Sequence, residues 1–128
     1  MILGNFTSFV DPALLILRLV VAVIFIYHAL PKLKNSQGMA KMVAMPAGMV
    51  LMLGMMELLA AMALILGVWS QLAALVLAVI MIGALGMKIM KWHVPFGAMD
   101  KTGWEFDLIL LAASLVIIVT DGGQINVF

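Results

Sequence analysis

Four long, mainly apolar stretches constrain this chain of 128 residues more than any other feature of its sequence. They cover residues 13–30, 47–69, 72–90 and 104–120, and each is close to the ~20 residues that a helix needs to cross the hydrocarbon core of a bilayer. They lack the two-residue alternation of membrane β-barrel strands and are rich in Ala, Leu and Met, which favour helices. The sequence therefore predicts an all-α integral membrane protein, a bundle of four transmembrane helices forming a single domain over residues 1–128.

The composition excludes most other classes of protein. Hydrophobic residues make up 66% of the chain and charged residues 10%, whereas a soluble domain is about 45–50% apolar and ~25% charged. The few charges nearly balance, 7 basic against 6 acidic, which argues against a nucleic-acid partner. The absence of cysteine excludes thiolate metal sites, iron–sulfur clusters and dithiol chemistry, and no metal site is predicted. We expect membrane lipid as the main surroundings of the chain.

The basic residues predict the orientation of the helices. The lysines lie only in or beside the first and third connections: Lys32, Lys34, Lys41, Lys88, Lys91 and Lys101. Because cytoplasmic loops of membrane proteins are enriched in Lys and Arg, both connections are expected to face the cytoplasm. We therefore predict a multi-pass protein of the cell membrane with its N-terminus, its C-terminus and the turn at Ser70 and Gln71 outside.

Proline and glycine predict where the helices begin and end. Pro31 is expected to follow the end of the first helix and Pro46 to open the second. The Asp-Gly-Gly sequence at residues 121–123 is expected to stop the last helix. Only Ser70 and Gln71 separate the second and third stretches, which predicts an antiparallel hairpin.

Arg18 and Glu57 lie inside apolar stretches, where a charged side chain costs roughly 2.5–3.5 kcal/mol on insertion scales. Counted from the middle of each expected helix, both lie within about 5 Å of the bilayer centre, so we expect them to pair with each other. Such a pair either fixes the register of two helices or takes part in binding or proton movement, and the sequence leaves both roles open.

Polar residues are also predicted to converge at the cytoplasmic membrane surface. His28 and Lys32 share one face of the first helix, and Trp104, Glu105 and Asp107 open the last helix on the same side. Glu105 and Asp107 are about 200° apart around a helix, so at most one faces the interior, and we expect Glu105 to do so. The alternative roles are interface anchoring for His28 and Lys32 and helix capping for the two carboxylates.

Methionine is unusually frequent, with 13 residues. Six recur at helical spacing: Met39, Met42, Met45, Met49, Met52 and Met56. Thioethers favour Cu(I), which makes a copper path one interpretation of this series. Methionine is also an adaptable packing residue, and packing is the interpretation that we favour.

The order of these residues resembles the DoxX family of small four-helix membrane proteins, which is related to the DoxD-type subunit of thiosulfate:quinone oxidoreductase. The resemblance rests on Leu-Arg-Leu at residues 17–19, Tyr-His-Ala-Leu-Pro-Lys-Leu at 27–33, Gly-Met-Met-Glu-Leu-Leu at 54–59 and Gly-Trp-Glu-Phe at 103–106. Ala29 departs from the glycine that the family commonly has after the histidine. The positions that match the characteristic polar residues of the family are Arg18, His28, Lys32, Glu57, Trp104 and Glu105.

This resemblance implies a membrane subunit of a redox assembly that works with other membrane or redox subunits. We expect a quinone or a small sulfur-containing substrate in a cytoplasm-facing pocket, and no intrinsic cofactor besides a bound quinone. His28 and Glu105 can exchange protons and are the predicted catalytic residues. The predicted substrate-binding residues are Arg18, Lys32, Glu57 and Trp104.

Two other functions fit the same sequence. A non-catalytic scaffold would stabilise a larger membrane complex, with the apolar exterior of the bundle against partner helices. A small transporter or proton path would use Glu57 in the middle of the membrane. Binding of quinone by the isolated protein would distinguish the quinone-binding redox subunit from the scaffold.

Overall fold

The chain is mostly helical in the part that the computed structural model describes, which is residue 4, residues 6–97, residue 99 and residues 101–125. Its elements, in order, are η1 (Thr7–Phe9), α1 (Val10–Lys34), α2 (Ser36–Val43), α3 (Ala47–Leu66), α4 (Ser70–Gly86), the π-helical turn η2 (Met87–Lys91) and α5 (Trp104–Thr120). No β-strand occurs in these described residues. The prediction of an all-α fold is confirmed.

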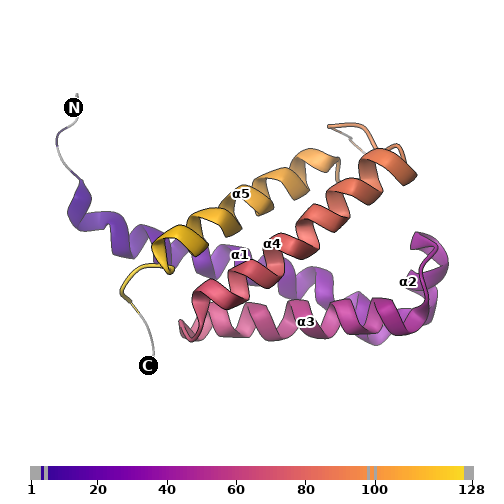
Figure 1. Cartoon of the computed structure of the whole chain (residues 1–128), viewed down its shortest axis with the longest axis horizontal. Coiled ribbons are helices and arrows are strands. Elements are labelled where there is room, and N and C mark those ends of the chain that lie inside the picture. Colours follow the sequence, from indigo (N-terminus) through magenta and orange to yellow (C-terminus); the bar gives the residue numbers. More distant parts are fainter. Residues whose placement is uncertain (1–3, 5, 98, 100, 126–128) are drawn as a thin grey trace.

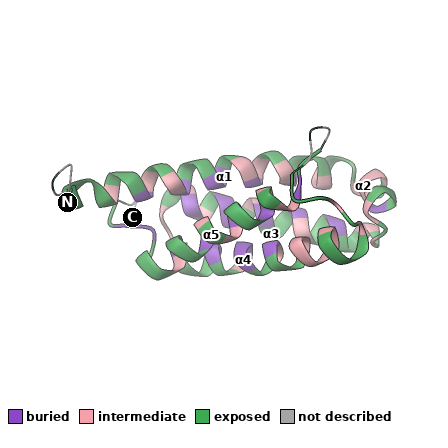
Figure 2. Ribbon diagram, turned by 90° about the horizontal axis from the view of Figure 1, so that it is seen from above, coloured by how far each residue is buried: buried purple, intermediate pink, exposed green. Residues whose placement is uncertain are grey.

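The long helices form two packed pairs (Figure 1). α1 packs mainly on α3 and α4 on α5, while a tight turn between α3 and α4 joins the pairs. The side chains between the helices are apolar, and Phe25, Leu64, Leu77 and Ile117 are almost completely buried. Figure 2 shows buried residues along the inward faces of the helices and exposed residues along their outer faces. The core therefore runs along the length of the bundle.

The outer surface of the bundle is apolar, as membrane lipid requires. Three stretches of the described residues are long and apolar enough to cross a membrane: Thr7–Lys34, Ala47–Leu66 and Ser70–Lys91. The exposed outer positions include Val23, Leu59 and Val119. A helix that is apolar on every side belongs in a core or in lipid, so the chain is built as a membrane protein. α5, with 17 residues, packs along α4, and its crossing of the membrane stays a prediction.

The two ends of the bundle differ in charge. α2, η2 and the segment between α4 and α5 lie at one end, and the start of α1, the end of α5 and the α3–α4 turn lie toward the other (Figure 1). The lysines lie at the end that carries α2 and η2: Lys32, Lys34, Lys41, Lys88, Lys91 and Lys101. We call it the lysine-rich end. That this end faces the cytoplasm, with both termini outside, stays a prediction from the sequence.

The first helix is longer than predicted. Pro31 lies inside α1 instead of following its end, and the backbone N–H of Asn35 donates to the carbonyl of Pro31 at 2.9 Å. The last turn of α1 packs closely against α3, because a Cβ at Gly54 would lie 2.9 Å from Lys32 Cβ and 3.2 Å from Leu33. This tertiary contact holds the helix together beyond the proline.

Other helix ends are partly as predicted. Pro46 precedes α3 and Asp121 ends α5 in a left-handed conformation, so both predictions are confirmed. The hairpin turn consists of residues 67–69, with Gly67 and Trp69 left-handed, and Ser70 already begins α4. Helix α2 was not predicted; the side chain of Asn35 caps it by accepting from the backbone N–H of Gly38 at 3.2 Å.

The close approach of α1 and α3 predicts that Gly54→Ala destabilises the bundle. The added Cβ would force Lys32 Cβ and the helix that carries it away from α3. Overpacking of this kind typically costs about 1–3 kcal/mol, which we expect as a loss in the free energy of unfolding measured by denaturation in detergent micelles.

Gly48→Ala in the same helix is the matched control, because a Cβ at Gly48 meets no atom within 4 Å. Alanine has the higher helix propensity, so this control is expected to be neutral or slightly stabilising. Equal stability of the two variants would contradict the close packing of α1 on α3.

Candidate functional site

Glu57 of α3 forms a buried ion pair with Lys32 of α1. Lys32 Nζ donates to Glu57 Oε1 at 2.5 Å, and the side chains are 22% and 1% exposed, respectively. Taking a charge out of water costs several kcal/mol, so the lysine compensates a carboxylate that would otherwise be unfavourable at this position. The second oxygen, Glu57 Oε2, is buried and has no hydrogen-bond partner among the described residues. The pair therefore retains one unused acceptor.

The predicted pairing of Arg18 with Glu57 is wrong. Arg18 Nη1 donates to the backbone carbonyl of Gly122 at 3.1 Å and so links α1 to the chain just beyond α5. Gly122 comes so close that a Cβ there would lie 2.7 Å from Arg18 Cδ. Residues 18 and 32 lie about 21 Å apart along the axis of α1. The register that pairs Lys32 with Glu57 thus leaves Arg18 near the opposite end of the bundle.

A second ion pair joins η2 to α5. Lys88 Nζ lies 2.7 Å from Asp107 Oδ2. Lys88 also donates to Thr102 Oγ1 at 3.1 Å, so its ammonium group holds the segment before α5 as well. Asp107 lies on the buried face of α5, together with Leu110 and Ser114.

Both ion pairs line one cavity of about 580 Å³ at the lysine-rich end. This volume lies within the ~300–1,000 Å³ typical of small-molecule sites. Its wall is mostly apolar, and the ionisable or hydroxyl side chains in the lining are His28, Lys32, Glu57, Lys88, Thr102 and Asp107. His28 rests against Phe106 of α5, with ring centroids 5.3 Å apart. The cavity therefore combines an apolar body with a small group of polar side chains.

Methionine side chains form much of the cavity wall. In the described lining they are Met39, Met45, Met49, Met52, Met56, Met81 and Met87. Most of the helically spaced series lines the cavity, whereas Met42 lies outside the lining; Met49, Met52 and Met56 line it and are also partly exposed at the surface of the bundle. The series is divided between α2 and α3, because the chain turns at Ala44 and Pro46. Methionine adapts its shape to its neighbours and makes favourable contacts with aromatic rings, so this wall suits a ring-shaped ligand.

In the first turn of α5, Asp107 faces the interior in place of Glu105, which the sequence had predicted. Asp107 is 4% exposed and lines the cavity, whereas Glu105 is exposed and outside the lining. The prediction that only one of them faces inward is correct, and the choice of Glu105 is wrong. Trp104 stacks on Phe96 with ring centroids 4.5 Å apart, so its side chain fixes the segment before α5.

Of the predicted site residues, the structure thus brings His28, Lys32 and Glu57 into one cavity and leaves Arg18, Trp104 and Glu105 outside its lining. Lys88 and Asp107 complete the polar group and were not chosen from the sequence. The signal was present, because Lys88 lies within the apolar stretch 72–90, where a lysine needs a partner. Only the fold shows that this partner is Asp107.

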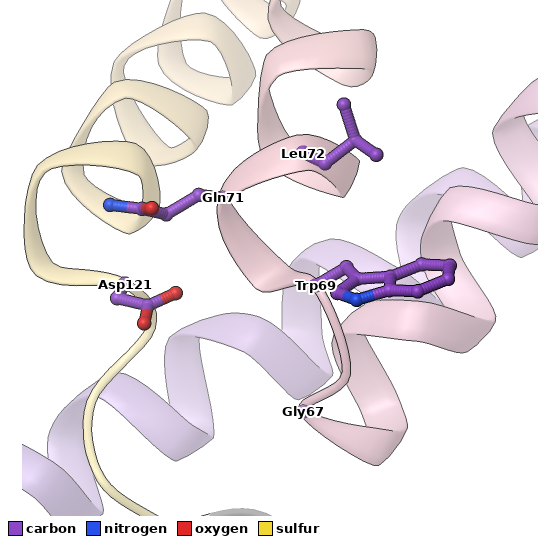
Figure 3. A pocket seen from close by; sticks show the side chains of 5 residues that line it. All are labelled: Gly67, Trp69, Gln71, Leu72 and Asp121. Carbon is purple, nitrogen blue, oxygen red and sulfur yellow. The ribbon is translucent and has the colours of Figure 1, made fainter.

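A shallower depression of about 410 Å³ lies near the other end, beside the α3–α4 turn (Figure 3). Gln71 points toward α5 there, and its Nε2 donates to the carbonyl of Ile118 at 2.9 Å. The side chains of Trp69 and Leu72 point away from Asp121 (Figure 3). This depression contains helix-end contacts, so we place the candidate site in the cavity at the lysine-rich end.

Comparison with models of protein families finds a match to DoxX over residues 13–94. The matched region includes Lys32, Glu57 and Lys88 and ends before α5. No curated protein and no solved structure matches the chain.

The buried ion pair predicts that Lys32→Met strongly destabilises the protein. The substitution removes the cation and leaves the carboxylate of Glu57 buried without its partner. Removing one member of a buried pair costs about 3–5 kcal/mol, to be measured as a loss in the free energy of unfolding in detergent micelles. Lys34→Met, at an exposed position of the same helix, is the control.

The double variant Lys32→Met/Glu57→Met should recover most of the lost stability, since two apolar side chains of similar volume need no charge compensation. If Lys32→Met were as stable as the Lys34→Met control, the pair would not contribute to the stability of the fold.

Proposed function

The chain belongs to the DoxX family, and we propose that it is the quinone-binding membrane subunit of a redox assembly. The observation that carries this proposal is the cavity of about 580 Å³, whose apolar wall holds His28 and two lysine–carboxylate pairs. A membrane quinone likewise combines a large apolar part, its tail and ring, with two polar oxygens. The family match supports membrane placement, and the chemistry of the cavity supports the choice of ligand.

The side chains of the cavity fit the requirements of a quinone ring. Ring carbonyls only accept hydrogen bonds, and the ammonium group of Lys32 has three donors, one of which is used by Glu57. Methionine sulfur and the ring of Phe106 offer contacts to an aromatic ring. A small sulfur-containing substrate is less favoured, because it would leave most of the cavity unfilled. When bound, a quinone supplies two-electron, two-proton redox chemistry.

His28 is the proton-exchanging residue in this proposal. It is half-buried, lines the cavity and rests against Phe106, and imidazole gains and loses protons near neutral pH. The carboxylate role predicted for Glu105 passes to Asp107, which lines the cavity. Arg18 and Trp104 have structural roles instead, at the end of α5 and in the segment before it.

The electrons of such an assembly come from a partner subunit in this proposal. The sequence contains no cysteine and therefore no ligands for an iron–sulfur cluster and no dithiol. The apolar outer faces of the helices can contact either lipid or the helices of such a partner. With the lysine-rich end on the cytoplasmic side of the cell membrane, the polar group of the cavity lies near that surface.

Binding of a benzoquinone with a decyl tail to the purified protein in lipid nanodiscs tests the proposal. We expect saturable binding above the partitioning measured with empty nanodiscs. His28→Ala should weaken binding by about tenfold, the effect of losing one hydrogen bond of about 1.4 kcal/mol. Trp69→Ala, at an exposed position near the opposite end, should leave binding unchanged.

Partitioning that never saturates, or binding that His28→Ala leaves unchanged, would contradict the proposed site. Co-purification of other subunits together with non-saturable partitioning would favour the scaffold function instead.

A further inference from the structure

We infer that the cavity binds the reduced, quinol form of its ligand more tightly than the quinone, and that Glu57 is the residue that distinguishes them. The inference rests on the proposed function, since it specifies which form of the ligand the same cavity prefers. It follows from the hydrogen-bonding capacity that the Lys32–Glu57 pair leaves unused.

The unused groups of this pair are one acceptor and a set of donors. Glu57 Oε1 accepts from Lys32 Nζ at 2.5 Å, whereas the buried Oε2 has no hydrogen-bond partner among the described residues. Nζ can make further bonds, because an ammonium group carries three hydrogens. A buried acceptor without a partner is unfavourable, most of all when it carries a charge. A ligand that donates to Glu57 would remove this cost.

A hydroxyl group can both accept a hydrogen bond from Lys32 and donate one to Glu57, whereas a carbonyl can only accept. The oxygen of a quinol accepts from Lys32 while its hydrogen is donated to Glu57; a quinone oxygen can only accept. Oε2 is covered by neighbouring atoms, but Glu57 lines the cavity and the terminal torsion of a glutamate side chain is soft. Because the two carboxylate oxygens are equivalent, rotation of the group can present one oxygen to the ligand while the other accepts from Lys32. The bound quinone would leave the carboxylate oxygen unpaired, and the bound quinol would not.

The surroundings of the pair favour an aromatic alcohol over other hydroxyl compounds. Met56, on the same helix as Glu57, and Phe106 line the same cavity. Thioethers and aromatic rings interact well with the edge and face of an aromatic ring. Glu57 is also the more buried of the two cavity carboxylates, so a lost hydrogen bond costs more at Glu57 than at Asp107.

The preference has a redox consequence that does not depend on turnover. Tighter binding of the reduced form makes the bound quinone easier to reduce than the free quinone. For a two-electron couple, each tenfold preference raises the reduction potential by about 30 mV.

The test compares three ligands that share a decyl tail: the benzoquinone, its quinol and the dimethyl ether of the quinol. Binding to the protein in nanodiscs is measured without oxygen and corrected with empty nanodiscs. We expect the quinol to bind about tenfold more tightly than the quinone, and the ether, which cannot donate, to lose this advantage. The potential of the bound couple should rise by about 30 mV.

Glu57→Gln supplies a donor as well as an acceptor, so it should improve quinone binding relative to quinol binding and remove most of the preference. If this variant folds poorly, Lys32→Met/Glu57→Met replaces the whole pair with side chains of similar volume and should bind both forms equally. Asp11→Asn is the matched control: it lies near the N-terminal end of α1 and should keep the full preference, since an amide oxygen can still accept from the backbone N–H of Gln124.

The outcomes separate this inference from the proposed function. Equal binding of quinone and quinol to the unaltered protein overturns the inference and leaves the proposed function standing. Saturable binding of neither form overturns both. A preference for quinol that persists in both Glu57 variants overturns the role of Glu57.

Discussion

The ion pair between Lys32 and Glu57 is the interaction on which the rest of this structure depends. It connects α1 to α3 where Gly54 lets the two helices approach, so charge compensation and close packing fix the same register. That register places Arg18 against Gly122, where its guanidinium ties α1 to the end of α5. The buried ion pair and the close packing at Gly54 together set how the first helix lies along the bundle.

The cavity follows from the same arrangement. Two ion pairs place charged groups in its wall: Lys32 with Glu57, and Lys88 with Asp107. The rest of the wall is largely methionine and aliphatic side chains. Lys91 Nζ donates to the carbonyl of Ala44 at 3.4 Å, which connects η2 to the turn between α2 and α3. Polar contacts therefore join the elements around the cavity, while flexible thioether side chains let its interior adapt to a ligand.

The sequence was sufficient to predict those features of the structure that local chemistry decides. The length of the apolar stretches, Pro46, Asp121 and the position of the lysines predicted the helical class, two helix ends and the lysine-rich end. The partner of Glu57 could not be predicted, because it depends on how far α1 is shifted along α3. The inward carboxylate of α5 was missed for a related reason: a helix that is apolar all round gives no signal of which face is buried.

Photolabelling with an azido derivative of a decyl-tailed benzoquinone tests the central claim most directly, because it reports where the ligand lies. The labelled protein in nanodiscs would be digested and its adducts mapped by mass spectrometry. We expect adducts at cavity residues such as Leu53 and Phe106 that disappear when excess unlabelled quinone is added. Adducts confined to lipid-facing positions such as Val23 and Val119, and insensitive to that competition, would contradict it.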